Sequence, residues 1–298
     1  MAIFRARTGK HIDGYVDDMV SVITKILSAS AYAYFHWLCD YLGLEIALEK
    51  CMTPDVIRLF LGLLYNLVDM IMTLPEEKLH RVLHMLNEWL DRETCTKAQT
   101  QSLLGHLNHL TAVVHAGRPF TARVVDLLRE ATFPAKITDE LKQDIRVWIQ
   151  FLTSEFSCSS IIKSQDLAPP DETLCVAVNG QTFVIQCNGH ASAFELHRDM
   201  PYFPNPVMHA IAVWKAGHQH VNELTGKVVK VSVPTKAAAV VVNRAKTHIN
   251  VIRPMIRDMW MCQARNDFMI KAVPQTSHIK QTLYSTFHDF QTIKVPLK

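Results

Sequence analysis

Two adjacent acidic residues inside an apolar run constrain the fold of this chain more than any other feature of its sequence. Asp17 and Asp18 stand between the apolar pairs Tyr15-Val16 and Met19-Val20. In one continuous strand the two carboxylates would lie on opposite faces, and an unpaired carboxylate that is buried costs several kcal/mol. A tight turn between two short strands avoids this burial. We therefore predict a hairpin that holds Asp17 and Asp18 at its tip.

Paired carboxylates at a hairpin tip suit one metal ion in particular. Mg²⁺ binds hard oxygen ligands and usually takes one or two protein carboxylates together with substrate phosphates. The sequence therefore indicates Asp17 and Asp18 as Mg²⁺ ligands. The alternative interpretation is a solvated turn without a ligand, because an Asp-Asp dipeptide is a weak motif on its own.

Size, charge and cysteine content restrict the class of protein. The chain has 298 residues, of which 49% are hydrophobic, and a net charge of +3. This length predicts two or three domains, and so small a charge does not by itself indicate nucleic-acid binding. The seven cysteines form no C-x-x-C pair, so we expect reduced thiols in an intracellular protein, with neither a disulfide framework nor a zinc site. No apolar stretch reaches the roughly 18 residues that cross a bilayer, and the N-terminus lacks a signal-peptide pattern, so we expect no membrane partner.

The segment from Tyr15 to Asp18 resembles the catalytic hairpin of reverse transcriptases, in which the motif is Tyr-x-Asp-Asp. Later segments resemble four further parts of these enzymes, in the family's order: a segment ending in a lysine near the incoming nucleotide, the primer-grip hairpin, the entry to the thumb helices and the helical stretch beyond. These segments are Cys39–Lys50, Phe60–Leu63, Leu74–Leu79, and Gln101–Asn108 with Gly117–Phe120. The combination is most similar to retrotransposon reverse transcriptases of the tyrosine-recombinase (DIRS-like) group.

The resemblance implies descent from an RNA-directed DNA polymerase, a nucleotidyltransferase with Mg²⁺ as its cofactor and an RNA/DNA template–primer duplex as its partner. The catalytic residues that it implies are Tyr15, Asp17, Asp18 and Lys50, with the two aspartates as the metal ligands. The nucleic-acid-binding residues that it implies are Gly62, Lys78 and Arg118.

The residue pattern and the resemblance together predict an α+β chain in four parts. These are a partial polymerase palm over 1–73, a helical thumb and connection over 74–156, a linker over 157–172 and an α/β ribonuclease H-like domain over 173–298. In the first two parts, the apolar spacing predicts strands within 56–73 and helices over 29–43, 75–92, 97–115, 119–130 and 138–152.

Beyond the linker the pattern changes to strands that later alternate with helices. Asn179-Gly180 is a strong hairpin signal between two short apolar runs. We expect strands over 174–178, 182–186, 228–233 and 268–273, and helices over 206–220, 236–245 and 250–265.

This order of elements resembles a ribonuclease H domain that has lost its catalytic acids. The family's chemistry needs about four acids that hold two Mg²⁺ ions roughly 4 Å apart. The matching positions are near Ala177, at His209, at Pro234 and near Thr282, and none of them is acidic. A small shift in register does not restore the site, because no Asp or Glu lies within 173–194 or 227–257. We therefore predict that ribonuclease H activity is absent.

Histidines near these positions are a further candidate metal set. His209, His218 and His220 could replace the acids, but histidine favours zinc and other transition metals over Mg²⁺. We also expect no carboxylate partner close to them in the sequence. The simpler interpretation is that all three are ordinary surface or core histidines.

The resemblance also shows what the polymerase part lacks. Reverse transcriptases bind their two metal ions with a third aspartate on an earlier strand, but only 14 residues precede Tyr15, and Asp13 is too close to the motif. Two acids alone do not readily hold two metal ions, a nucleotide and a primer end in line. We therefore expect a fragment that is inactive alone and that would need a missing N-terminal polymerase segment as its partner.

Two other functions stay open. A non-catalytic nucleic-acid-binding or interaction module would use basic residues of the second half, whereas a decaying element would have no function. A complete sheet with protected edges would favour the binding module, because unpaired strands are an aggregation liability. The basic residues form a solvated charged face in the simpler interpretation; they are Lys227, Lys230, Lys236, Arg244 and Lys246.

Overall fold

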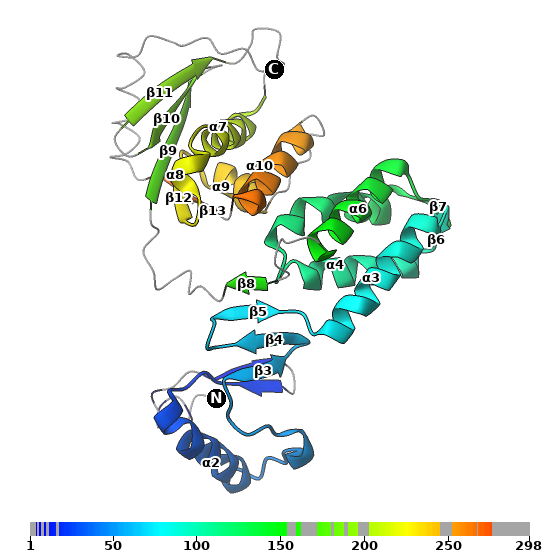
Figure 1. Ribbon diagram of the computed structural model, residues 1–298, viewed down its shortest axis with the longest axis vertical. Helices are drawn as coiled ribbons and strands as arrows, with labels where there is room; N and C mark the ends of the chain where they lie inside the picture. Colours follow the sequence, from blue (N-terminus) through cyan, green and yellow to red (C-terminus); the bar gives the residue numbers. More distant parts are fainter. Residues whose placement is uncertain are drawn as a thin grey trace. The chain divides into compact units, whose positions relative to one another are not determined.

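In the computed structural model the chain forms two compact units (Figure 1). The N-terminal unit comprises residues 1–78 and 159–162, and the large unit comprises residues 79–158 and 163–298. Both units mix helices with strands, in agreement with the predicted α+β class. The division into palm, thumb and nuclease-like parts stays a prediction. The structure describes residues 4, 6, 9, 12–15, 18–153, 159–161, 172–179, 182–187, 190–195, 203–244, 252–266 and 268–275.

A short strand pair and a helix begin the N-terminal unit. β1 (Asp13–Tyr15) pairs antiparallel with β2 (Asp18–Val20), with Tyr15 opposite Asp18, which confirms the two predicted strands around the acids. α2 (Lys25–Tyr41) follows and begins four residues earlier than predicted. The buried side of this region is a small cluster of Phe4, Ile12, Ala31 and Leu38.

Four antiparallel strands make the second sheet of this unit, in the order β3-β4-β5-β8. The first three confirm the strands predicted within 56–73. The fourth lies within the segment expected to be a linker, because its pairing with β5 is a contact between distant parts of the chain that no local pattern signals. The strands are β3 (Ile57–Phe60), β4 (Leu63–Asn66), β5 (Ile71–Thr73) and β8 (Ser159–Ile161).

Two tight turns connect the first three of these strands. Leu61 and Gly62 have φ angles of 49° and 72°, as a two-residue turn that follows the strand twist requires. Glycine adopts this conformation without strain, which explains Gly62, whereas leucine rarely does. In the next turn, the Asn66 side chain accepts hydrogen bonds from the backbone N–H groups of Val68 and Asp69 at 3.0 and 3.1 Å. Both turns are therefore encoded by residues within them.

Helices make up the first half of the large unit. The main departure from prediction is at 97–115, where the α-helix ends at Leu110 and a 3₁₀ segment follows around Gly117 and Pro119. Thr96 and Gln99 form a capping box that starts the helix at Lys97. The elements are α3 (Glu76–Asp91), α4 (Lys97–Leu110), η2 (His115–Thr121), α5 (Ala122–Glu130) and α6 (Asp139–Thr153), with the short strand pair β6 (Thr94–Cys95) and β7 (Ala135–Lys136).

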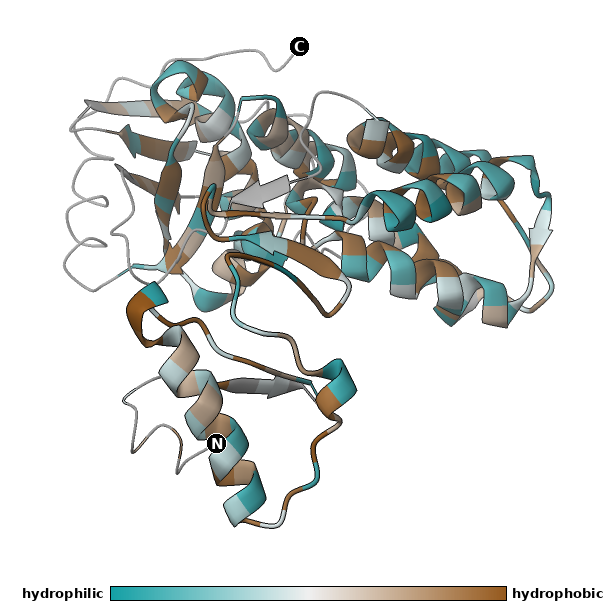
Figure 2. Ribbon diagram, turned by 60° about the horizontal axis from the view of Figure 1, so that its bottom comes forward, coloured by the Kyte–Doolittle hydropathy of each residue, from teal (hydrophilic) through white to brown (hydrophobic). Residues whose placement is uncertain are grey.

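Large apolar side chains from these helices are buried together. Hydrophobic and hydrophilic residues lie on different sides of each helix, as Figure 2 shows. Such a stripe pattern is what the sequence spacing predicted for 75–92 and 138–152. The large apolar side chains that are buried include Leu86, Trp89, Leu103, Leu107, Leu110, Ile145, Trp148 and Phe151.

A five-stranded sheet forms the second half of the large unit, in the order β11-β10-β9-β12-β13. The first three strands are antiparallel, whereas β12 runs parallel to β9, and β13 runs parallel to β12. One apolar face of the sheet packs with the helices of this half into a single core. The strands are β9 (Glu172–Asn179), β10 (Thr182–Cys187), β11 (His190–Glu195), β12 (Val228–Val233) and β13 (Met269–Pro274).

Four helices accompany this sheet, and three of them lie where the sequence predicted helices. The fourth is the short helix after α7. Among the strands, β11 was not predicted, because the segment His190–Glu195 has no β-branched residue to favour a strand. The helices are α7 (Asn205–Gln219), α8 (Val221–Leu224), α9 (Lys236–Arg244) and α10 (Arg253–Arg265).

Two expectations drawn from composition can be compared with the described residues. No helix among them has both the length and the apolar character that crossing a membrane requires. The cysteines in this part of the chain are thiols, as expected: Cys39, Cys51, Cys95, Cys175, Cys187 and Cys262.

The close approach of Gly117 to Trp148 gives a first prediction. A Cβ atom at Gly117 would lie 2.1 Å from the Trp148 ring, whereas a Cβ atom at Gly105 would meet nothing within 4 Å. We expect Gly117→Ala to lower the free energy of unfolding by about 1–3 kcal/mol, because the ring is buried and cannot move aside. Gly105→Ala, in the middle of α4, should raise it by about 0.5–1 kcal/mol. Urea unfolding followed by circular dichroism measures both, and equal effects of the two substitutions would contradict the prediction.

Candidate functional site

The acid hairpin of the N-terminal unit presents one described carboxylate to solvent. Asp18 begins β2 and is exposed, opposite Tyr15 of β1. Asp17 lies outside the described residues. Lys50, expected near an incoming nucleotide, is also exposed, at the end of the 3₁₀ turn η1 (Leu48–Lys50). An exposed carboxylate fits the donor chemistry of Mg²⁺, and the assignment of catalytic roles to these residues stays a prediction.

The structure brings together two of the three residues expected to bind nucleic acid. Lys78 lies in the first turn of α3, and its Nζ donates a hydrogen bond to the Gly62 carbonyl oxygen at 3.2 Å. Gly62 is at the tip of the β3–β4 hairpin, so the ammonium group is held beside this tip. The third residue, Arg118, is exposed in η2 of the large unit.

Three of the four expected nuclease positions can be placed, and they hold no acid. Ala177 is fully buried on β9, and Pro234 is buried directly after β12. β9 and β12 are parallel, and Ser232 lies opposite Cys175. Pro234 and Ala177 each follow two residues later, so continuing the same register would place them opposite each other. The fourth position, Thr282, lies outside the described residues.

His209 occupies the remaining position and is buried without charge. It lies in α7 with 3% of its surface exposed, and its Nδ1 is 2.5 Å from the Asn205 carbonyl oxygen, which places the ring proton on Nδ1. Burial lowers the pKa of His209, although the hydrogen bond to Asn205 opposes this shift. Within the described part of the chain, Nε2 has no hydrogen-bond partner. A neutral imidazole in this place cannot stand in for a carboxylate ligand of Mg²⁺.

Sequence reasoning missed Gln275, which joins the strands beside these positions. The pairing of β9 with β12 extends to Cys175 and Ser232. Beyond it, the buried side-chain amide of Gln275 donates hydrogen bonds to the carbonyl oxygens of Val176 and Ser232 at 2.8 and 2.9 Å. The apolar pattern of a strand does not mark such a glutamine. Its role depends on two backbone carbonyl groups, distant in the sequence, to which it donates hydrogen bonds.

Two other histidines correct an expectation. The Nε2 of His218 lies 2.7 Å from a carboxylate oxygen of Asp258, and the Nδ1 of His220 lies 3.1 Å from a carboxylate oxygen of Glu223. The expectation that no carboxylate partner lies close in the sequence was therefore wrong for His220, whereas the partner of His218 is 40 residues away. Glu223 is only three residues from His220, and α8 turns it back toward the ring.

A buried ion-pair cluster joins the two halves of the large unit. Asp144 of α6 is 2% exposed and accepts hydrogen bonds from Arg123 of α5 at 2.6 Å and from Arg257 of α10 at 2.7 Å. A second ion pair joins Asp126 of α5 to Arg253 of α10 at 2.6 Å. Burial raises the pKa of Asp144 to about 6, more than the neighbouring arginines lower it.

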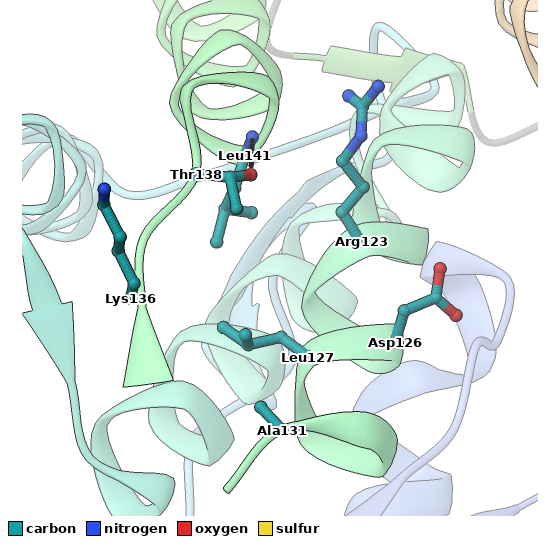
Figure 3. A pocket seen from close by; sticks show the side chains of 7 residues that line it. All are labelled: Arg123, Asp126, Leu127, Ala131, Lys136, Thr138 and Leu141. Carbon is teal, nitrogen blue, oxygen red and sulfur yellow. Dashed lines mark hydrogen bonds between the residues drawn. The ribbon is translucent and has the colours of Figure 1, made fainter. Parts of the chain in front are cut away.

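α5 and α6 also line a pocket of about 320 Å³. Figure 3 shows Arg123 and Lys136 on different sides of this pocket, with Thr138 and Leu141 between them. Arg123 is already engaged by Asp144 and by the Glu140 carbonyl oxygen. The pocket therefore offers an incoming anion little beyond Lys136. Its lining residues are Arg123, Asp126, Leu127, Ala131, Lys136, Thr138 and Leu141.

Two solved structures of a foamy viral protease-reverse transcriptase are partly similar in fold to this chain. For the complex with an RNA/DNA hybrid, the sequence identity is 13% and the TM-score is 0.46. The match covers 93% of this chain and 37% of the viral chain. For the dRH form in complex with double-stranded DNA, the sequence identity is 13% and the TM-score is 0.41. This match covers 89% of this chain and 46% of the viral chain. This chain thus spans less than half the length of the structures that it matches. No family model and no curated protein matches it.

The burial of His209 gives a pH-dependent prediction. The pKa of His209 in the folded state is lower than its ordinary value of 6.5, so the unfolded chain takes up the proton more readily. The contribution of His209 to stability should therefore fall as the pH falls from about 7.5 to about 5.5, whereas Asp144, whose pKa is raised to about 6, changes stability in the opposite direction. Relative to the wild type, His209→Gln should gain stability as the pH falls over that range. Thermal unfolding at both pH values measures the difference.

His106 supplies the matched control for this prediction. Its Nδ1 also lies beside a carbonyl oxygen four residues back, 2.8 Å from that of Ser102, but its side chain is exposed. His106→Gln should leave the pH dependence of the wild type unchanged. If His209→Gln and His106→Gln gave the same pH profile, burial of His209 would not be the cause.

Proposed function

We propose that this chain is part of a retrotransposon-type reverse transcriptase that holds a nucleic-acid duplex, does not cut RNA, and polymerises only together with further polymerase elements. The observation that carries the proposal is the five-stranded sheet of the large unit. Three antiparallel strands, a helix and two further parallel strands, in the order β11-β10-β9-β12-β13, match the arrangement expected of a ribonuclease H-like domain.

The chemistry of the vacated positions supports binding without cutting. Two-metal cleavage requires acids that hold both ions, and Ala177, His209 and Pro234 offer no anionic ligand. The same replacements leave no negative charge at these buried positions that would repel a nearby phosphate. Phosphate contacts dominate the affinity of such proteins, so fewer carboxylates at this place favour retention of a duplex.

The surface of the N-terminal unit supports the need for further polymerase elements. Among the described residues, every exposed large hydrophobic side chain except Val240 lies within residues 19–70. Trp37 and Tyr41 on α2 are examples, 54% and 73% exposed and stacked on each other at 5.3 Å. A surface so apolar is typical of a protein–protein contact. In this proposal Mg²⁺ binds Asp17 and Asp18, where it would supply charge for phosphoryl transfer, with Tyr15 and Lys50 as the other catalytic residues.

Duplex binding is tested by titrating a labelled RNA·DNA hybrid with the purified chain over a series of salt concentrations. We expect affinity to fall steeply with salt, because each phosphate contact releases counterions. Lys78→Met and Arg118→Met should each reduce the slope of log K against log salt by about 1. Lys97→Met is the control, since Lys97 is exposed at the start of α4 and has no expected role. A salt-independent affinity, or equal effects of all three substitutions, would refute the proposal.

Absence of ribonuclease H activity is tested separately on the same hybrid. We expect no Mg²⁺-dependent cutting by the wild type. The double variant His209→Glu with Pro234→Asp should also be inactive, because two further acids are missing near Ala177 and Thr282. Circular dichroism establishes that the variant is folded, and RNA cutting by either protein would overturn this part of the proposal.

A further inference from the structure

Three side chains that are capable of binding a metal ion meet at one end of the β11-β10-β9-β12-β13 sheet. Cys187 is the last residue of β10, His220 joins α7 to α8, and Glu223 lies in α8. The Cys187 Sγ is 3.6 Å from one carboxylate oxygen of Glu223, and the His220 Nδ1 is 3.1 Å from the other. One ligand atom from each residue lies within 4.8 Å of the other two. The three groups therefore converge on a single point.

These separations are close to those of a metal site. Around a tetrahedral Zn²⁺, with bonds of about 2.3 Å to sulfur and about 2.0–2.1 Å to nitrogen or oxygen, neighbouring ligand atoms are about 3.3–3.6 Å apart. The Cys187 Sγ and the His220 Nδ1 lie 3.6 and 3.1 Å from two different oxygens of Glu223, within a few tenths of an ångström of these values. The three ligand atoms, one from each residue, lie within 4.8 Å of one another. The carboxylate rotates about its own bonds, so one oxygen can approach the ion without movement of the backbone.

The donor set selects the metal. A thiolate, an imidazole and a carboxylate together favour Zn²⁺, whereas Mg²⁺ and Ca²⁺ prefer oxygen ligands alone. Cys187 is 1% exposed and the His220 side chain is 12% exposed, but the Glu223 side chain is 49% exposed. The site is therefore closed on the protein side and open toward solvent. An ion held there by three protein ligands has its fourth position accessible to water.

This cluster is distinct from the vacated nuclease positions. His209 is in the first half of α7 and His220 follows its last residue, so the helix separates them by about 16 Å at 1.5 Å per residue. On the sheet, Ala177 pairs with Val184 of β10, whereas Cys187 pairs with Leu174. The two places are therefore 11 residues apart along the chain of α7 and three residues apart along β9 and β10. The cluster cannot be a remnant of the nuclease metal centre.

We propose that Cys187, His220 and Glu223 bind one Zn²⁺ ion, which fastens the end of β10 to the α7–α8 turn. On binding, a Zn–S bond forms as the Cys187 thiol loses its proton to solvent, while His220 and Glu223 each donate a lone pair without any change of oxidation state. The sequence did not predict this site, because Cys187 and Glu223 are 36 residues apart and no paired-cysteine motif marks them. The proposal stands independently of duplex binding.

Cobalt substitution tests this site directly. The purified full-length chain is stripped with a chelator and titrated with Co²⁺, which takes zinc geometry and reports it in absorption. We expect one equivalent to give a sulfur-to-cobalt charge-transfer band and the intense visible bands of a four-coordinate site, and Zn²⁺ to abolish both. The melting temperature of the stripped chain should rise with added Zn²⁺, because the ion binds only the folded state.

Substitutions decide which residues bind the ion. Cys187→Ser should abolish the charge-transfer band, and His220→Gln should weaken Co²⁺ binding at least tenfold. Glu223→Gln should also weaken it, and since Glu223 is half exposed, that variant keeps the test valid if the buried substitutions unfold the domain. Cys95→Ser and His218→Gln are the matched controls: a buried thiol and a carboxylate-paired histidine elsewhere in the same unit. Absence of the sulfur band in the wild type, or its persistence in Cys187→Ser, would overturn the proposal.

Discussion

One buried carboxylate connects the helical half of the large unit to its sheet half. Asp144 receives guanidinium groups from α5 and α10, and Arg257 also lies over the Phe120 ring at 5.2 Å. Because burial raises the pKa of Asp144 above its ordinary value of 3.8, to about 6, the folded state takes up a proton before the unfolded state does. This carboxyl group therefore contributes most to stability at low pH, and that contribution is lost as the pH rises through about 6. At neutral pH the cluster orients the two halves more than it stabilises them.

The position of α10 then determines where α7 lies. Both helices belong to the core on one face of the sheet, where Val207 and Ile211 of α7 and Ile256 and Met259 of α10 are buried together. This packing needs only apolar side chains, so the fold does not depend on carboxylates at the positions where the resemblance placed a nuclease site. Several acids held close together repel one another and must be desolvated, which costs folding free energy. Ala177, a neutral His209 and Pro234 carry no such cost.

The parts of this structure that the sequence predicted are those with local signals. The helices over 75–92 and 138–152 have long apolar stripes. β12 begins and ends at the predicted residues, and its valines alternate with Lys230 and Ser232 as in a strand. The parts that it missed depend on distant contacts. β8 exists only through its pairing with β5, and Gln275 acts only through carbonyl groups of β9 and β12. Asp144 likewise acts only through guanidinium groups of α5 and α10.

The two units differ in how much of their own apolar surface they bury. The buried cluster around α2 contains four residues, whereas a single core runs through the sheet half of the large unit. A short strand pair such as β1–β2 is marginally stable in water unless other parts of a protein cover it. The exposed apolar side chains within 19–70 show that much of this cover is not supplied by the described residues themselves. Under the proposed function, the contact that covers these side chains would also stabilise the hairpin that carries Asp17 and Asp18, so that assembly and metal binding would be coupled.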